Sequence, residues 1–552
     1  MRSIHVEERP RSAVAGARRG GWDVPDMRAL ERWSARGLCA RPPHANGRRF
    51  LIVHLDGVSR SRLERGMADG SLPNLNALAR DGQHRLSPMY AGAPSSTPSF
   101  QAGLLWGVRA DVPGFLWFDK RTGKRVRMDD AEDAARVEAT VSAGRRGLLE
   151  DGTTYFSIFS GGTGVNAWCL TGWRSGRVRL QPGANAWDCA SLCAVHARTA
   201  ARVSMGAVVE GANAICDGVG HAARTGRADH ERAFLKNRVL LAAGARAYAT
   251  YATALDLARG VPSIYTCFAD YDEIAHRRGP DSAEALRALA STDRSVGVLW
   301  RALRAADRDY DLYVLADHGQ VATRPFEQAL GGATGRPPSA RAAPVRGVSR
   351  GLFNLGRAGW RAAQGVGAAQ GAGARADPTL EVIEAGDVAH LYFVERPTPL
   401  TLEEIEARHP AALAAVLGSA GAGVVAVRGG RAGWAFMGGA RIDLASARDC
   451  ARLQLGYGWR RVAESLRAML GLPSAGDLVV YGNGVPGGDV AYAWELGSHG
   501  GIARDEVETF VIHPAAAPFD FGAVEHASDL YRFFTGHYRL ARRDARGPLA
   551  AW

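Results

Sequence analysis

Three apolar runs that each end in acidic residues constrain the fold more than any other feature of this sequence. They are FLIVHLDG (50–57), SIYTCFADYDE (263–273) and YDLYVLADHG (310–319). Continuous apolar runs of this length are typical of parallel strands that are buried on both faces. Active sites of open α/β sheets form at the carboxyl ends of such strands. We therefore predict that the carboxylates that follow the three runs lie at one edge of a sheet.

The segments between these runs have helical patterns, as in residues 282–306, which have apolar residues at helical spacing. Alternation of strands and helices predicts an α/β fold, a doubly wound and mostly parallel central sheet flanked by helices. A chain of 552 residues can bury a large core. Nothing in the spacing of the runs indicates an internal repeat.

Composition divides the chain into segments. We expect a basic, flexible lead-in, a single catalytic domain, a helical cap inserted within it, a flexible linker rich in Gly, Ala and Pro, and a C-terminal helical segment. The respective ranges are 1–48, 49–515, 121–260, 331–378 and 516–552. The cap insertion contains amphipathic stretches that could instead dock on a membrane surface.

Within the C-terminal part of the predicted domain, three further elements can be read from the pattern. Residues 384–395 are predicted to form a strand and residues 400–418 a helix that Thr401 opens. Residues 424–437 read as a pair of strands in a hairpin.

The formal net charge is +12, carried almost wholly by Arg. The Arg, Ala and Gly usage is typical of a GC-rich bacterial genome, so solvated Arg faces are the first interpretation of the charge. Attraction of an anionic substrate or an acidic lipid surface is the alternative.

The seven Cys residues form no C-x-x-C pair, and their odd number argues against a complete disulfide framework. Residues 1–21 lack the apolar core of a secretory signal, and residues 201–220 are too polar for a membrane span. We expect a soluble protein of the cytoplasm, with peripheral membrane contact and export as alternatives.

Six Asp and His residues in four short motifs are candidate metal ligands: Asp56, Asp272, His276, Asp317, His318 and His499. Carboxylate and imidazole groups are natural zinc ligands. Asp272 and His276 stand four positions apart, which puts both side chains on one face of a helix. Alone, each motif has an ordinary explanation, such as a helix cap or a surface pair. Together they predict a metal-binding pocket.

Thr97 is the candidate nucleophile. It stands in a hydroxyl-rich run, Ser95 to Thr97, followed by Pro98. Such a run most often caps a helix, and Pro is favoured at the first helical position. The two interpretations are compatible, because a helix N-terminus offers N–H groups and positive dipole to a phosphoryl group.

With these motifs, the chain resembles the alkaline phosphatase superfamily and, within it, the type I phosphodiesterase/nucleotide pyrophosphatase branch. The nucleophile of that branch is a Thr with a Gly ten residues later. The matching residues are Thr97 and Gly107, then Asp272, His276, Gly279 and Pro280 for D-x-x-x-H-x-x-G-P, Asp317, His318 and Gly319 for D-H-G, and His499 and Gly500 for H-G. Residues 112–120 are similar to the segment downstream of the nucleophile.

The resemblance implies a phosphodiesterase that uses two divalent metals, zinc being the first expectation and Mn²⁺ or Ca²⁺ the alternatives. It implies that Asp56, Asp317 and His318 hold one metal, which activates Thr97 for attack on phosphorus. It implies that Asp272, His276 and His499 hold the other, which stabilises the leaving oxygen. The product of the first step would be a phospho-threonine intermediate.

One position departs from the family pattern. The branch usually has an Asn three residues after the Thr, and this chain has Phe100 there. Gln101 could supply the missing amide, and Phe100, Trp117 and Lys120 are further candidates for substrate contact. For Trp117, core packing is an equally good interpretation. The departure weakens any expectation of nucleotide specificity.

Other functions on the same scaffold stay open, namely a phosphomonoesterase or a phosphonate or sulfate ester hydrolase. A different class is a non-catalytic protein that binds an anionic partner. We expect a small-molecule or lipid-derived phosphate ester as the substrate, because no nucleic-acid-binding motif is present. The sequence makes no prediction of the oligomeric state.

Overall fold

The computed structural model describes residues 42–163, 169–174, 211–221, 244–306, 308–326, 380–455 and 458–540, with a few single positions between them. The predicted lead-in up to residue 41 and the linker at 331–378 lie outside the described residues. None of the described helices is long and apolar enough to cross a membrane.

Six strands of the described chain form a central sheet in the order β2-β18-β7-β1-β6-β5. β1 pairs in parallel with both β6 and β7, and β5 pairs in parallel with β6. β18 runs antiparallel to its neighbours β7 and β2. The predicted fold class, a mostly parallel α/β sheet, is confirmed. The strands are β1 (Arg49–Leu55), β2 (His84–Tyr90), β5 (Thr153–Tyr155), β6 (Ser263–Phe268), β7 (Tyr310–Leu315) and β18 (Glu508–Pro514).

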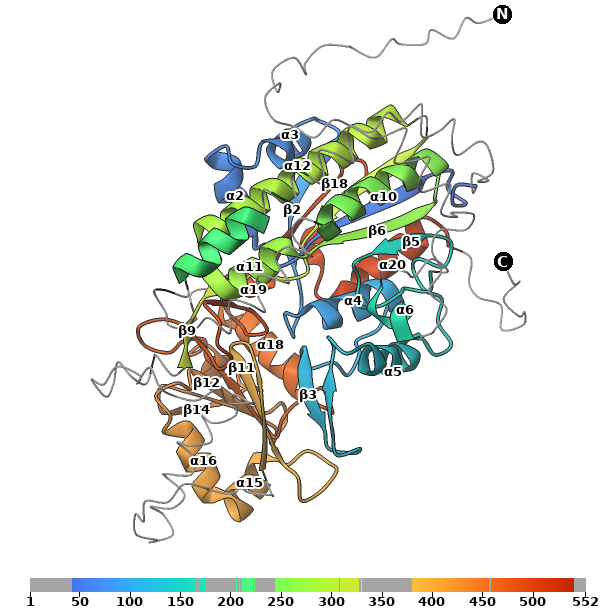
Figure 1. Cartoon of the computed structure of the whole chain (residues 1–552). Helices are drawn as coiled ribbons and strands as arrows, with labels where there is room; N and C mark the ends of the chain where they lie inside the picture. Colours follow the sequence, from blue (N-terminus) through green and yellow to red (C-terminus); the bar gives the residue numbers. More distant parts are fainter. Residues whose placement is uncertain are drawn as a thin grey trace, which may run out of the picture.

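Helices cover both faces of this sheet (Figure 1). One layer contains α2 (Arg60–Ala68), α3 (Pro73–Ala79), α10 (Arg246–Arg259), α11 (Asp270–Arg278) and α12 (Ala283–Ala305). The other contains α4 (Thr97–Trp106), α5 (Ala131–Ser142), α6 (Leu170–Arg174), the 3-10 turn η2 (Phe521–Ala523) and α20 (Ala527–His537). The helical prediction for 282–306 is confirmed by α12, and α20 lies within the segment expected to be helical at the C-terminus.

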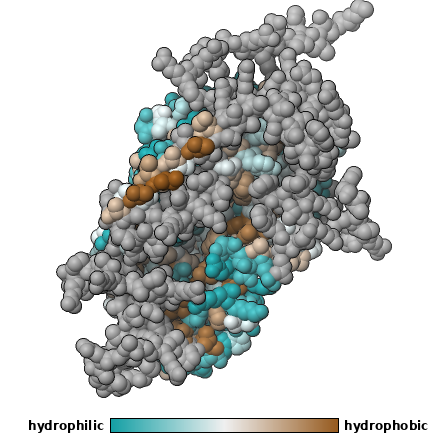
Figure 2. Space-filling model, in the orientation of Figure 1, coloured by the Kyte–Doolittle hydropathy of each residue, from teal (hydrophilic) through white to brown (hydrophobic). Residues whose placement is uncertain are grey.

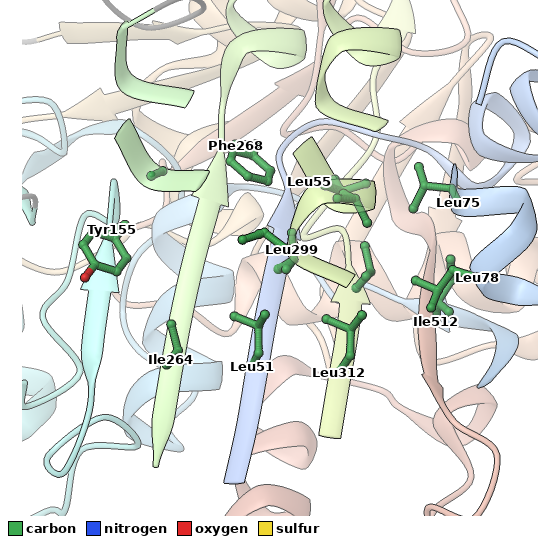
Figure 3. Close-up of a cluster of buried hydrophobic side chains, with 14 of the residues drawn as sticks. Leu51, Leu55, Leu75, Leu78, Tyr155, Ile264, Phe268, Leu299, Leu312 and Ile512 are labelled. Atoms are coloured by element: carbon green, nitrogen blue, oxygen red, sulfur yellow. The ribbon is translucent and has the colours of Figure 1, made fainter. Parts of the chain in front are cut away.

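Side chains of β1 alternate between the two layers. Leu51 and Leu55 belong to the core beneath α10 and α12, where Figure 3 shows them beside Ile264 and Leu312 of the neighbouring strands. Phe50 and Ile52, which occupy the alternate positions of the strand, belong to the core beneath α4 and α20. Burial on both faces explains why the run is apolar without alternation, and full burial of such a side chain stabilises the fold by about 1.5–3 kcal/mol.

The described ends of the insertion at 121–260 differ from the expected cap. β5 is an edge strand of the central sheet, and α10 packs on α12 and β6. Both elements therefore belong to the catalytic core, because their apolar residues fill the same core as β1. A cap remains a prediction only for the middle of the insertion, most of which lies outside the described residues.

A second sheet of the described chain is antiparallel throughout, in the order β10-β11-β15-β12-β13-β14. Its strands are β10 (Leu380–Ala385), β11 (Val388–Phe393), β12 (Val424–Val427), β13 (Trp434–Met437), β14 (Ala440–Asp443) and β15 (Leu478–Tyr481). One face packs on α15 (Leu402–Arg408) and α16 (Pro410–Leu417), and the other on α17 (Ala447–Cys450) and α18 (Trp459–Leu470). Figure 1 shows this sheet below the central one.

Two predictions in this region need a correction. Within residues 384–395, Val388–Phe393 form β11 as predicted, but Glu384 and Ala385 are the end of β10 and residues 386–387 form the turn, so the range spans part of a hairpin. Residues 400–418 form two helices that break before Pro410, because proline lacks the N–H that a continuous helix needs. Thr401 does open the first helix in a capping box with Glu404, and the hairpin at 424–437 is confirmed.

Short strand pairs complete the fold. β3 (Leu116–Asp119) pairs with β4 (Lys124–Arg127), β8 (Val321–Ala322) with β17 (Gly497–Ser498), and β9 (Arg324–Pro325) with β16 (Val490–Ala491). The short helix α19 (Arg504–Val507) precedes β18. Ile215 and Val219 are 53% and 66% exposed, in a segment whose Asp217 pairs with Arg287 of α12. Figure 2 shows hydrophobic colour on this side of the molecule, along the helical layer.

The β3–β4 hairpin is fastened to the second sheet by Lys120. Its ammonium group donates to Asp477 Oδ2 at 2.9 Å and to the Thr398 carbonyl oxygen at 2.9 Å. Asp477 is fully buried and also accepts from the backbone N–H groups of Phe393 and Leu400. The buried carboxylate therefore depends on Lys120 for its positive partner.

We predict that K120M will lower the free energy of unfolding by about 3–5 kcal/mol, because Asp477 would stay buried without a cation. R60A removes an exposed pair with Glu64 and should cost less than about 1 kcal/mol. Urea unfolding of both variants measures the difference. Equal stability of the two variants would show that the Lys120 contact does not stabilise the fold.

Candidate metal centre and nucleophile

The ends of three parallel strands carry the candidate carboxylates. Asp56 directly follows β1, Asp317 follows β7 by two residues, and Asp272 lies in the first turn of α11, which begins two residues after β6. β7, β1 and β6 are adjacent in the sheet, so their carboxyl ends share one edge. This is the edge at which the apolar runs were expected to deliver their acids.

The last candidate ligand reaches this edge through a strand pair. β17 pairs antiparallel with β8, which lies just after Asp317 and His318. His499 follows β17 directly, and its Nδ1 lies 2.9 Å from the Ser95 carbonyl oxygen. Ser95 Oγ in turn donates to the Gly501 carbonyl oxygen at 3.0 Å. The loop that carries His499 is thereby joined to the loop before Thr97.

One group of potential ligands consists of His54, Asp56 and Asp317, whose ligand atoms lie within 4.8 Å of one another. His318 Nε2 lies 3.5 Å from Asp56 Oδ1 and 3.3 Å from Asp317 Oδ2, so this imidazole also borders the group. The trio that the resemblance implies, Asp56, Asp317 and His318, is thus contiguous, with His54 as an additional neighbour.

A second group consists of Asp272, His318 and His499, again within 4.8 Å. The rings of His318 and His499 stack with centroids 3.7 Å apart. His276 Nε2 lies 3.2 Å from Asp272 Oδ2, and its ring centroid is 5.0 Å from that of His499. The structure therefore brings all six candidate ligands into one cluster, in which His318 lies between the two groups.

Thr97 opens α4 at the border of this cluster. Its Oγ1 lies 3.1 Å from His318 Nε2 and 3.4 Å from Asp56 Oδ1. Ser96 is the N-cap residue, but its side chain makes no capping bond, and Pro98 occupies the first turn. The hydroxyl-rich run therefore leaves Thr97 directed at the candidate ligands rather than using it as the cap.

The cluster concentrates negative charge in a buried place. Burial and the neighbouring Asp317 and Asp272 carboxylates raise the pKa of Asp56 well above its usual range. Asp317 Oδ2 is buried and makes no hydrogen bond within the described chain. Buried carboxylates with a free oxygen are costly unless a cation compensates them. The donor set of carboxylates and imidazoles therefore fits divalent metals, zinc in particular.

Two glycines permit the close approach of the strand ends. Gly57 has a φ of +73°, and a Cβ there would lie 2.3 Å from Asp272 Oδ1. At Gly319 a Cβ would lie 1.9 Å from the Asp505 carbonyl oxygen. A side chain at either position would push the ligand-bearing loops apart.

A family model for type I phosphodiesterase/nucleotide pyrophosphatase matches residues 50–332. The chain belongs to this family. It is therefore a hydrolase of phosphoric esters, and the matched region contains Thr97 and all of the candidate ligands except His499. No curated protein matches the chain.

Solved structures of the phosphonoacetate hydrolase of Sinorhizobium meliloti 1021 are also similar to this chain. The complex with phosphonoformate has a TM-score of 0.43 and 16% identity, and the complex with phosphonoacetate has 0.42 and 14%. Each comparison covers 90% of this chain and 96% of the hydrolase.

Sequence reasoning missed three side chains that support the candidate ligands. His54 contacts Asp317, Gln320 donates to Asp272 Oδ1 at 2.5 Å, and Glu495 Oε2 lies 3.2 Å from His276 Nδ1. His54 could have been recognised as the one polar residue inside the run LIVHL. Gln320 and Glu495 carry no comparable signal, because only the strand pair β8–β17 brings them to the site.

Neighbouring carboxylates raise the pKa values of two histidines of the site, His276 and His54. Burial lowers the pKa of His276, but Glu495 and Asp272 outweigh it and raise that pKa well above its usual value. Burial likewise lowers the pKa of His54, while Asp317 outweighs it and raises the pKa.

The four candidates for substrate contact occupy different surroundings. Phe100 and Trp117 are each 3% exposed and belong to the core beneath α4. Both ends of the Gln101 amide are hydrogen-bonded within the fold, so donation to a phosphate would require breaking a bond to Tyr265. Lys120 is paired with Asp477, as described above. Their contact with substrate stays a prediction.

A buried carboxyl pair holds the far side of the His499 loop. Glu506 accepts from the backbone N–H groups of Gly501 and Ala503 at 3.3 Å and 2.6 Å. Its partner Asp387 accepts from Asn483 at 2.9 Å, and both carboxyl side chains are fully buried. Burial and the neighbouring Asp387 raise the pKa of Glu506 well above its usual range, which favours the protonated form of Glu506.

This pair predicts a pH dependence of stability. The unfolded state loses the Glu506 proton near pH 4, and the folded state keeps it to higher pH. Stability should therefore fall as pH rises above the unfolded pKa, whereas the profile of E506Q, which mimics the protonated form, should be flatter.

Unfolding midpoints in denaturant at several pH values measure this effect. E64Q changes an exposed glutamate and is the matched control. Parallel pH profiles for wild type and E506Q would rule out the raised pKa of Glu506.

Proposed function

We propose that the protein is a metal-dependent phosphodiesterase in which Thr97 is the nucleophile. The observation that carries this proposal is the position of Thr97 Oγ1, 3.1 Å from His318 Nε2 and 3.4 Å from Asp56 Oδ1, at the first residue of α4. A hydroxyl in contact with an imidazole and a carboxylate has the surroundings of an activated nucleophile.

The residues of the site account for a two-step reaction. Thr97 Oγ attacks phosphorus, its proton passes to a neighbouring acceptor, and the bond between phosphorus and the leaving alcohol breaks. The resulting phospho-threonine is then hydrolysed by water, which restores the hydroxyl. Free N–H groups at the start of α4 would bind the phosphoryl oxygens.

The proposed ligands form two sets. Asp56, Asp317 and His318 would hold one divalent ion, and Asp272, His276 and His499 the other. Such ions, which we propose to be zinc, supply Lewis acidity that lowers the pKa of the threonine hydroxyl and neutralises charge on the phosphoryl and leaving oxygens. The proposal is supported by the contiguity of the ligand atoms and by the free oxygen of Asp317.

The proposed substrate is a small diester, nucleotide-like or lipid-derived. Phe100 in place of the usual Asn removes one amide from the nucleophile helix, and a buried phenyl ring stands there instead. Fewer fixed donors to the phosphate favour a substrate that carries a single negative charge at phosphorus over a phosphomonoester with two.

The first test is a pair of substitutions at Thr97. T97A should lower kcat for bis-nitrophenyl phosphate by roughly 10³-fold or more, because no group could form the covalent intermediate. T97S keeps a hydroxyl and should retain measurable turnover. Both variants should bind as much metal as wild type in elemental analysis, since Thr97 is not needed to hold the ligand residues. Full activity of T97A would refute the assignment of the nucleophile.

A second test concerns the charge of the substrate. Wild type should hydrolyse bis-nitrophenyl phosphate with a higher kcat/KM than nitrophenyl phosphate or nitrophenyl sulfate at equal concentrations. A preference for the monoester would favour a phosphomonoesterase, and a preference for the sulfate would favour a sulfatase.

A third test is removal of metal. A chelator should abolish activity and lower the thermal midpoint, because the carboxylates of the cluster would face one another without compensation. Restoring Zn²⁺ should recover both quantities. An unchanged thermal midpoint after complete removal would contradict a metal role for this cluster.

A further inference from the structure

His54 is a titratable side chain within the apolar run of β1. Its ring is fully buried, Nε2 lies 2.9 Å from Asp317 Oδ1, and Nδ1 lies 2.6 Å from the Tyr265 hydroxyl. It belongs to neither set of proposed ligands, although its position beside Asp56 and Asp317 would allow it to bind a cation. The direction of its hydrogen bonds decides whether His54 can bind a cation itself or can only support Asp317.

The direction is set at the other end of the network, at Gln101. The Gln101 Oε1 atom accepts from the backbone N–H groups of Ile158 and Phe159 at 2.9 Å and 3.3 Å. Because backbone N–H groups can only donate, the amide cannot be flipped without losing both bonds. Its Nε2 is therefore a donor, and it lies 3.3 Å from the Tyr265 hydroxyl oxygen.

Tyr265 must consequently donate to His54. The phenol is fully buried, and Gln101 Nε2 and His54 Nδ1 are its hydrogen-bond neighbours in the described chain. Since the Gln101 nitrogen cannot accept, the hydroxyl proton points to His54 Nδ1. A neutral imidazole that accepts at Nδ1 carries its own proton on Nε2. A protonated Nε2 cannot bind a metal and instead faces Asp317 Oδ1.

We propose that His54, Tyr265 and Gln101 act as a positioning relay that fixes Asp317 as a metal ligand, an inference that rests on the proposed metal-dependent function. Asp317 Oδ1 also lies 2.9 Å from the His318 N–H and 3.5 Å from the Gly57 N–H. Two backbone N–H groups and the close contact of His54 Nε2 thus lie at Oδ1, whereas Oδ2 makes no hydrogen bond in the described chain and is left for the cation. Hydrogen bonds behind a ligand of this kind orient it and tune its basicity.

The relay also links the ligand to the nucleophile. Gln101 lies on α4 one turn after Thr97, and Asp317 lies at the end of β7. Tyr265 on β6 and His54 on β1 bridge the space between them. A shift of α4 would therefore be transmitted to Asp317 through contacts that are all buried, which keeps the positions of the Thr97 hydroxyl and Asp317 coupled.

The test compares two tyrosines that differ in this contact alone. Tyr265 and Tyr313 are both buried in the core beneath α4, but the Tyr313 hydroxyl pairs with Tyr538 instead. Metal-free Y265F and Y313F are titrated with Zn²⁺ in competition with a chromophoric chelator. We expect Y265F to weaken one of two zinc affinities by about 10–100-fold and Y313F to leave both unchanged.

Two substitutions of His54 separate positioning from ligation. H54Q keeps an N–H donor that can reach Asp317, and H54L removes it. A positioning role predicts two bound zinc ions in H54Q, with affinities close to wild type, and one weakened affinity in H54L. Loss of a zinc ion from H54Q would show that His54 is itself a ligand and would overturn the relay.

Wild-type zinc affinities in Y265F would overturn the relay as well. These outcomes are separate from failure of the proposed function. If wild-type protein binds two zinc ions but hydrolyses no phosphodiester, the function is wrong while the zinc titrations still decide the role of His54. Circular dichroism of each metal-free variant checks that the fold is intact, so that a lost affinity is not a consequence of unfolding.

Discussion

The convergence of three buried carboxylates at the ends of β1, β6 and β7 is the constraint on which the rest of the structure depends. Asp56, Asp272 and Asp317 are buried, and the charges of Asp317 and Asp272 help to raise the pKa of Asp56. Such an arrangement is costly without cations. Imidazoles from α11, from the turn after β7 and from the loop after β17 lie beside these carboxylates and would complete the two proposed donor sets. The nucleophile helix α4 then begins beside them.

Much of the remaining architecture serves to hold this cluster. The second sheet contributes no candidate ligand, but one of its turns lies close to the loop that carries His499. Asp387 lies in the turn between β10 and β11 and interacts with Glu506. Glu506 in turn accepts from the backbone of the His499 loop at Gly501. Ser95 holds the same loop from the side of α4. The loop is thus fixed between the two sheets. This arrangement explains how a ligand some 180 residues after Asp317 can belong to the same site.

The central sheet could be predicted because its strands are buried on both faces and therefore leave continuous apolar runs in the sequence. The convergence of the six candidate ligands and Thr97 on one place could be predicted because each lies in a recognisable motif at or near a strand end or a helix start. The two helices at 402–417 were predicted as one, since the pattern of apolar residues continues through Pro410. Proline sets the boundary against that pattern.

Other features had no local signal. β5 and α10 join the central sheet across a long insertion, and short, partly polar elements of this kind do not reveal their partners in sequence. Lys120 was a candidate for substrate contact, yet its partner Asp477 stands 357 residues away. The relay through His54 likewise joins residues of three separate elements. Contacts of this kind depend on the fold as a whole.

The central claim is that two cations occupy this one cluster, and anomalous diffraction at the zinc edge tests it most directly. Crystals of the zinc-loaded protein should give two strong peaks, one contacting Asp56, Asp317 and His318 and the other contacting Asp272, His276 and His499. Peaks elsewhere, or a single peak bound by His54 in place of His318, would contradict this account of the site.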